Sequence, residues 1–178
     1  MVMLNSFTAV KFIWITLFCL ISALATAQNK PLESPIVEKS SSLFSSDSLV
    51  GLAKSLLGIP YQYGGCTTSG FDCSGFVNYV FSNFGIELPR SSPELALVGM
   101  EVPIDSVQKG DIILFAGSNK ASRPVGHAGI VITEGGEPLK FIHSATSNRK
   151  GIVITPFDAF DYYKSRFVKV VRVLKAIN

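Results

Sequence analysis

The spacing of apolar residues changes along this chain from a helical period to short strand-like runs, and this change limits the folds open to it. Before residue 95, apolar side chains recur three and four residues apart, as on one buried face of a helix. After residue 110 they form short runs bounded by Gly, Pro and other turn-forming residues, as in strands. Helices first and strands afterwards predict an α+β domain with an antiparallel sheet.

Three helices are predicted from their boundary signals. Asp47 or Ser48 can cap the first helix, and Gly58 is suited to end it. The second is expected over 73–84, with one apolar face, and a short third helix is expected to begin near Ser92. The expected strands are 111–115, 127–133, 139–143, 151–155 and 167–174.

The N-terminus has the composition of an export signal. Lys11 supplies the positive charge, 12–24 is an apolar core, and Ala25-Thr26-Ala27 is a cleavage site of small residues. We expect residues 1–27 to be a cleaved signal peptide, with an uncleaved membrane anchor as the alternative. A Ser-rich flexible linker is then expected over 28–47, and one catalytic domain over 48–178.

The net charge and length of the chain bear on its partner and on the number of domains. Removing residues 1–27 takes away one Lys and no acid, so the mature chain carries 15 basic and 13 acidic residues, 15 − 13 = +2. This near-neutral chain has no block of like charge, which argues against a nucleic-acid partner. About 150 residues suffice for a single core. We expect a monomer in the periplasm or outside the cell, without a stable membrane anchor.

Two cysteines remain in the mature chain, Cys66 and Cys73. Two thiols are too few for a disulfide framework, and a domain of this size does not need one. A bridge between these two cysteines is an alternative on counting alone, and it would block any nucleophile at Cys73.

Cys73 lies where a helix is expected to start, with Asp72 or Ser74 available to cap the first turn. The unpaired amides and the dipole of a helix N-terminus stabilise a thiolate. His127 and His143, the only histidines in the chain, follow in strand-like segments. This order predicts Cys73 as nucleophile, His127 as general base and His143 as the residue that orients the His127 ring.

A hairpin turn over 134–137 would place both histidines at the far ends of paired strands, where both can face one helix terminus. The backbone amide of Cys73 and the hydroxyl of Tyr61 are candidate oxyanion donors. Taken singly, such a cysteine is more often a small buried apolar residue and such a histidine structural. A zinc site from these three residues is disfavoured, because the paired spacing of structural zinc ligands is absent.

Six segments spread over about 48–174 carry a family resemblance. They read Pro60-Tyr61-Gln62-Tyr63-Gly64-Gly65, Phe71-Asp72-Cys73-Ser74-Gly75-Phe76-Val77, Leu88-Pro89-Arg90-Ser91, Lys109-Gly110-Asp111-Ile112-Ile113-Leu114-Phe115, Gly126-His127-Ala128-Gly129-Ile130-Val131 and Phe141-Ile142-His143-Ser144. With these segments the chain resembles the NlpC-type family of cell-wall endopeptidases, which are papain-like in fold. The resemblance implies N-terminal helices, with the nucleophile at a helix N-terminus, packed on a central antiparallel β-sheet, and a catalytic triad of Cys73, His127 and His143 without metal or cofactor.

The substrate implied by this resemblance is the peptide stem of peptidoglycan or its muropeptides. Family members commonly cut between D-glutamate, through its γ-carboxyl, and the following diamino acid (meso-diaminopimelate or L-Lys). In members that need a free N-terminal L-Ala, the positions of Tyr61, Asp72 and Ser74 line the pocket for that end, and Asp72 can pair with the ammonium group. The segment 28–47 is too short for an accessory wall-binding module, and Cys66 is an unusual neighbour that could modulate activity by oxidation.

Two other functions are compatible with the same residues. An N-acetylmuramoyl-L-alanine amidase or an acyl transferase would share the triad and the thioester intermediate, and would differ only in the acceptor pocket. A catalytically inactive wall-binding domain is the third interpretation. The presence of Cys73, His127 and His143 together argues against it, because a binding module needs none of them.

Overall fold

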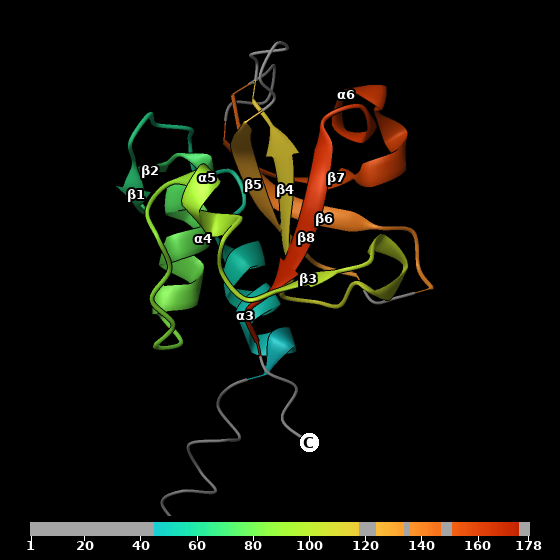
Figure 1. The fold of residues 1–178 in the computed structure, drawn as a ribbon. Helices are drawn as coiled ribbons and strands as arrows, with labels where there is room; N and C mark the ends of the chain where they lie inside the picture. The colour runs from blue at the N-terminus through green and yellow to red at the C-terminus, as the bar shows by residue number, and fades with distance from the viewer. Residues whose placement is uncertain (1–44, 118–123, 134–135, 147–150, 175–178) are drawn as a thin grey trace, which may run out of the picture. The chain divides into compact units, whose positions relative to one another are not determined.

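The computed structural model describes residues 45–117, 124–133, 136–146 and 151–174 (Figure 1). The expected signal peptide, 1–27, lies outside the described residues, as do 28–44 of the expected linker and Glu134 and Gly135 of the expected hairpin turn. Among the residues described, no helix is both long and apolar enough to cross a membrane.

A six-stranded antiparallel sheet forms the centre of the described domain, which confirms the predicted α+β class. Its strand order is β3-β8-β4-β5-β6-β7. The bounds are β3 (Met100–Val102), β4 (Ile112–Ala116), β5 (Val125–Val131), β6 (Lys140–Ala145), β7 (Gly151–Pro156) and β8 (Phe167–Arg172). The five predicted strands are present, and none of their ends is shifted by more than two residues. The edge strand β3 was not predicted, nor was the small hairpin of β1 (Cys66–Thr67) and β2 (Gly70–Phe71).

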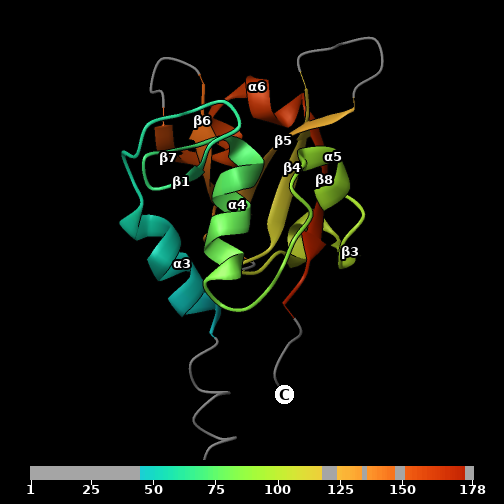
Figure 2. The ribbon, with the colours of Figure 1, turned by 90° about the vertical axis from the view of Figure 1, so that its left-hand side faces the viewer.

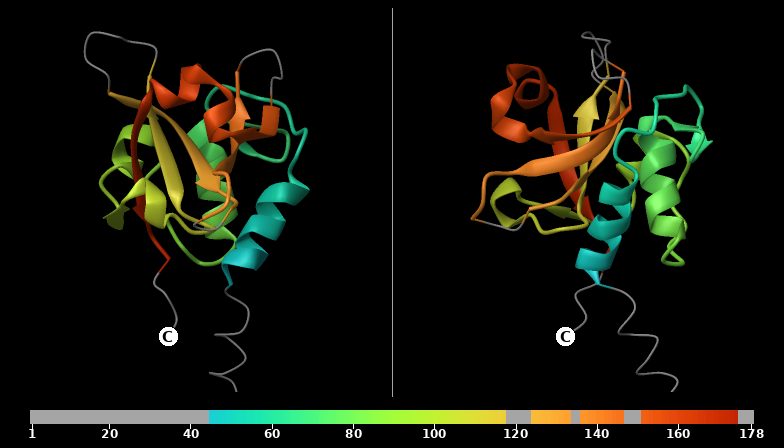
Figure 3. Two further views of the ribbon diagram at one scale, coloured as in Figure 1. Left: turned by 90° about the vertical axis from the view of Figure 1, so that its right-hand side faces the viewer. Right: turned by 180° about the vertical axis from the view of Figure 1, so that it is seen from behind.

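The longer helices cover one face of the sheet. α3 (Ser46–Ser55) and α4 (Cys73–Ser82) pack against it together, and the short α5 (Ser92–Leu95) lies at the end of α4 that begins with Cys73 (Figures 1 and 2). On the opposite face lies α6 (Asp161–Lys164), another element that was not predicted (Figure 3). Two single 3₁₀ turns, Ile104–Ser106 and Phe157–Ala159, connect strands.

The helix boundaries follow from their caps. Ser45, and not Asp47 or Ser48, caps α3: its side chain accepts a hydrogen bond from the Ser48 amide at 3.1 Å. Asp47 instead lies in the first turn, where a carboxylate interacts well with the helix dipole. Of the two predicted caps of α4, Asp72 and Ser74, it is Asp72 that caps the helix: its side chain accepts a hydrogen bond from the Gly75 amide at 2.6 Å.

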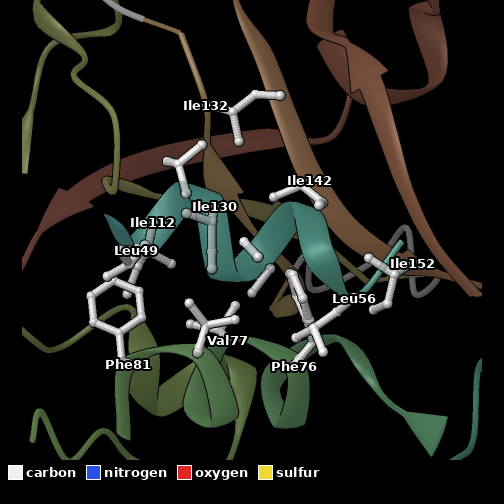
Figure 4. Packing of buried hydrophobic residues seen from close by; sticks show 14 of the residues in the cluster. Leu49, Leu56, Phe76, Val77, Phe81, Ile112, Ile130, Ile132, Ile142 and Ile152 are labelled. Atoms are coloured by element: carbon white, nitrogen blue, oxygen red, sulfur yellow. The ribbon is translucent and has the colours of Figure 1, made fainter. Parts of the chain in front are cut away.

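Each face of the sheet buries its own set of apolar side chains. Figure 4 shows the first set, in which isoleucines from four strands pack against leucine and phenylalanine side chains of α3 and α4. The second set lies on the opposite face and is richer in aromatic rings: Phe115 and Phe141 are fully buried there, with Phe157, Tyr163 and Phe167 packed against them. Because strand residues alternate between faces, Ile112 and Ile113 belong to different sets, and β4 is buried on both sides.

Candidate active site

Cys73 is the first residue of α4 and lies where α4, α5 and β5 meet. Its Sγ atom is 3.3 Å from the Oγ of Ser92, the first residue of α5. The same Sγ is 4.0 Å from the carbonyl oxygen of Gly126, the residue before His127. Cys73 is partly exposed, and the backbone amides at the start of a helix have no intrahelical partner. The thiol is therefore both reachable and close to unpaired donors.

The glycine-rich loop before α4 lies directly against the start of the helix. The Asp72 amide donates to the carbonyl of Gly65 at 3.0 Å, and a Cβ on Gly75 would collide with that same carbonyl. Gly75 thus permits a close approach that no other residue would allow. The loop brings Tyr61 near the thiol: partial burial raises the pKa of Tyr61, and negative charge on Cys73 and Asp72 raises it further.

The two histidines come from neighbouring strands and contact each other through their rings. The Nε2 atom of His127 is 2.9 Å from the Nδ1 atom of His143, with the ring planes nearly perpendicular. Gly129 lies on the same face, and a Cβ there would come within 3.1 Å of the His143 Cβ and 2.9 Å of the Phe141 ring. The Gly126-His127-Ala128-Gly129 segment therefore supplies the histidine and the space for its partner.

Burial keeps both imidazoles neutral near pH 7. The ring centroid of His127 is 6.0 Å from that of Phe115, while the His143 ring packs on Phe141 at 4.8 Å and lies 5.4 Å from Tyr163. Although part of His127 remains accessible to water, burial of its ring lowers its pKa to about 4. The pKa of His143 is well below its usual value, first because of burial and then because of the charge of His127. A neutral imidazole can accept a proton from a thiol.

The second ring nitrogen of His143 also has partners. Its Nε2 atom lies 3.0 Å from the Oγ1 of Thr155 on β7 and 3.4 Å from the hydroxyl oxygen of Tyr163 on α6. Neither residue was predicted from the sequence. Both lie at least 12 positions from His143, and nothing in their local sequence context marks them.

Asp72 and Ser74 form one hydrogen-bonded group with Arg90. The guanidinium donates to both carboxylate oxygens of Asp72, at 3.1 and 2.7 Å, and to the Ser74 hydroxyl at 3.0 Å. This hydrogen bond with Asp72 is the main reason that the pKa of Arg90 is raised. Arg90 stands in one of the segments that carry the family resemblance, but no role was predicted for it. The structure joins it to two of the three predicted substrate-binding residues.

The segment that carries the nucleophile is also tied to β6. The buried hydroxyl of Ser144, next to His143, donates to the carbonyl oxygen of Phe71 at 2.7 Å. Since Phe71 precedes the cap of α4 by one residue, this bond fixes the helix start relative to the histidine strands.

Cys66 and Cys73 are both free thiols. Cys66 is exposed on β1 and makes no bridge to Cys73, so the alternative of a disulfide between them is not realised. Within the described parts of the chain, no three side chains among His, Cys, Asp and Glu are grouped so as to hold a metal ion.

Comparison with known proteins points to one family. The model of the NlpC/P60 family matches residues 58–172. The chain is 35% identical over 130 residues to a Gamma-DL-glutamyl hydrolase of Bacillus subtilis (strain 168), covering 72% of this chain and 30% of that protein. It is 37% identical over 118 residues to the Murein DD-endopeptidase MepS/Murein LD-carboxypeptidase of Escherichia coli (strain K12), covering 66% of this chain and 57% of the relative.

The fold matches as well. A crystal structure of an NlpC/P60 family protein from Bacillus cereus ATCC 10987 superposes with a TM-score of 0.66 at 31% sequence identity, over 74% of this chain and 41% of that one. The chain thus spans about a third to just over half of the length of these relatives.

Proposed function

Because the chain belongs to the NlpC/P60 family, we propose that it is a cysteine peptidase that hydrolyses peptidoglycan stem peptides, with Cys73 as nucleophile, His127 as base and His143 as the orienting residue. The observation that carries the proposal is the contact of the two histidine rings, His127 near the start of β5 and His143 on β6, beside a thiol at the N-terminus of α4. A nucleophile, a base and a residue that orients the base are the parts that acyl transfer requires.

The ring contacts support a different role for each nitrogen of His127. Its Nε2 faces His143, which leaves Nδ1 to take the thiol proton. The Cys73 sulfur attacks the carbonyl carbon of the scissile amide, and the carbonyl oxygen becomes an oxyanion. The Cys73 amide and the Tyr61 hydroxyl are the proposed donors to it. The C–N bond then breaks, the amine leaves with the proton from His127, and a thioester remains.

Hydrolysis of the thioester reverses the roles. Water loses a proton to Nδ1 of His127 as its oxygen attacks the thioester carbon, and the C–S bond breaks. The sulfur regains its proton from the imidazolium, and the product carboxylic acid leaves. Apart from the substrate, only water is consumed.

We assign the scissile bond to that between D-glutamate, through its γ-carboxyl, and the diamino acid. The relation to a Gamma-DL-glutamyl hydrolase supports this assignment. The relation to a Murein DD-endopeptidase, at a similar identity, favours a second candidate, the D,D-bond of a crosslink between stems. An amidase or transferase would use the same triad on another bond or with another acceptor.

Tyr61, Asp72 and Ser74 form the proposed pocket for the amino end of the stem. Asp72 is largely buried and holds a half-exposed Arg90, so a substrate ammonium would share this carboxylate with a guanidinium. Arg90 thereby fixes the carboxylate in one orientation and reduces the net charge that the substrate meets.

The proposed place of action is the cell envelope. The intact wall lies outside the cytosol, so an enzyme that cuts it must be exported, which agrees with the predicted export signal over 1–27. We therefore propose a periplasmic or extracellular monomer whose partner is peptidoglycan or its released muropeptides.

Defined muropeptides test the proposal. The protein is incubated under reducing conditions with stem tetrapeptides, with and without a free N-terminal L-Ala, and with crosslinked dimers, and products are identified by mass spectrometry. We expect cleavage between D-Glu and the diamino acid, a fall in rate on the order of 10⁶-fold in Cys73→Ala, and near-full activity in the matched Cys66→Ala variant. Cleavage of the crosslink alone would select the second candidate. Unchanged cleavage by Cys73→Ala would refute the thiol mechanism.

A further inference from the structure

The fully buried ring of His143 makes a polar contact at each of its two nitrogens. Nδ1 faces His127 at 2.9 Å, and Nε2 faces the Thr155 hydroxyl at 3.0 Å. In a neutral imidazole one nitrogen carries hydrogen and the other accepts. The direction of the bond at Thr155 therefore decides the direction of the bond at His127.

Only one of the two directions suits a base at Nδ1 of His127. When His127 takes up a proton, both of its nitrogens carry hydrogen, so its Nε2–H must donate to Nδ1 of His143. His143 must then carry its own hydrogen on Nε2, and that buried N–H needs an acceptor. In the opposite tautomer, Nδ1–H of His143 would point at a protonated nitrogen and oppose charge on His127.

We propose that Thr155 is a positioning residue: its hydroxyl oxygen accepts the Nε2–H of His143 and holds that ring in the tautomer that supports a protonated His127. The tautomer can be measured without substrate, and only its effect on turnover rests on the proposed function.

The position of Thr155 follows from the pairing of β6 and β7. Phe141 pairs with Thr155 and His143 with Val153, so Thr155 lies on the same face as His143 and one pair along the sheet. Thr155 is nearly inaccessible to water. Aromatic rings cover this face, which keeps water from replacing the hydroxyl as acceptor.

Tyr163 is the weaker of the two contacts. Its hydroxyl oxygen is 3.4 Å from the same Nε2, against 3.0 Å for Thr155. Burial raises the pKa of Tyr163, with a further rise from Tyr162, so its hydroxyl stays neutral at working pH. The titratable side chains that contact the His143 ring in the described structure are thus His127 and Tyr163, and both are neutral at pH 7.

Nuclear magnetic resonance of the imidazole nitrogens tests this directly, because the chain contains only two histidines. Long-range ¹H–¹⁵N correlation at pH 7 on the untagged protein reports which nitrogen of each ring carries hydrogen. We expect His143 as the Nε2–H tautomer in the wild type and in Thr155→Ser, and a shift towards the Nδ1–H tautomer in Thr155→Val. Thr133→Val is the matched control: it removes another buried threonine hydroxyl, which accepts from Lys140, and should leave both tautomers unchanged.

Turnover is the second readout. Thr155→Val should lower kcat about tenfold with KM unchanged, the factor that one lost neutral hydrogen bond in the transition state corresponds to. Thr155→Ser, which keeps the hydroxyl, should have the kcat of the wild type. A wild-type His143 with hydrogen on Nδ1, or a tautomer unchanged in Thr155→Val but altered in Tyr163→Phe, would overturn the assignment. A tautomer shift in a protein that cuts no peptidoglycan would instead refute the proposed function and leave the role of Thr155 intact.

Discussion

Acidification from pH 8 to pH 5 should destabilise this fold, because folding buries two neutral imidazoles. The pKa of His127 is about 6.5 when unperturbed and about 4 in the folded protein. Between these values the unfolded chain binds more protons than the folded one, so stability is present above pH 6.5 and is lost as pH falls towards 4. His143, whose pKa is also lowered, acts in the same direction.

The size of the effect follows from the shift. One pKa unit corresponds to about 1.4 kcal/mol, and at pH 5 the imbalance at His127 alone amounts to about 2 kcal/mol. This is a large part of the 5–15 kcal/mol that is typical of a domain. Urea unfolding followed by far-ultraviolet circular dichroism at pH 8.0, 6.5 and 5.0 measures this loss of stability. These pH values lie above the range in which most carboxylates titrate.

The control is His127→Gln, which removes the titrating ring and places an uncharged side-chain amide near His143. We expect this variant to lose about 2 kcal/mol less than the wild type over the same range, with the residual loss due to His143. A wild type whose unfolding free energy stays level from pH 8 to pH 5 would show that the imidazoles are not held neutral by burial. An equal loss in His127→Gln would show that other groups cause it.

Two further substitutions test the packing around the site. Gly129→Ala should destabilise the fold by about 1–3 kcal/mol through overpacking against His143 and should lower activity, whereas Gly51→Ala, at an open helix position, should stabilise it slightly. Thermal unfolding of both variants measures the difference. Equal melting temperatures for the two variants would contradict the close approach at Gly129. Arg90→Gln should cost only about 0.5–1 kcal/mol of stability, since the guanidinium is half exposed. It should weaken substrate binding, because the Asp72 carboxylate is no longer held in one orientation. A KM unchanged from the wild type would show that Arg90 plays no part in the pocket.

The helix that carries the nucleophile could be predicted because its signals are local. Asp72 as cap, the four-residue apolar spacing and Gly85 beyond the last turn all lie within fifteen residues of one another. The order of elements also predicted an antiparallel sheet, since consecutive strands tend to pair. The cap of the first helix was predicted two or three residues late because Ser45, Asp47 and Ser48 are all good caps, and only the backbone at Ser45 has the extended conformation that a cap needs.

Other parts of the site depend on contacts between distant segments. Thr155 reaches His143 through the register of β6 and β7, and Tyr163 reaches it from a helix of four residues on the far face. Arg90 meets Asp72 across 18 positions, after the chain has reversed at the end of α4. The edge strand β3 has only three residues, of which Val102 alone is buried, and three residues are too few for an alternation to be recognised. No local pattern marks these residues.

The central claim is that Cys73 forms the thioester from which the stem is released. The most direct measurement is the initial rate at which the wild type, Cys73→Ala and Cys66→Ala release soluble products from purified peptidoglycan, once all three proteins are shown to be folded. We predict release by the wild type and Cys66→Ala, and none above background by Cys73→Ala. Release by Cys73→Ala at the wild-type rate would contradict it.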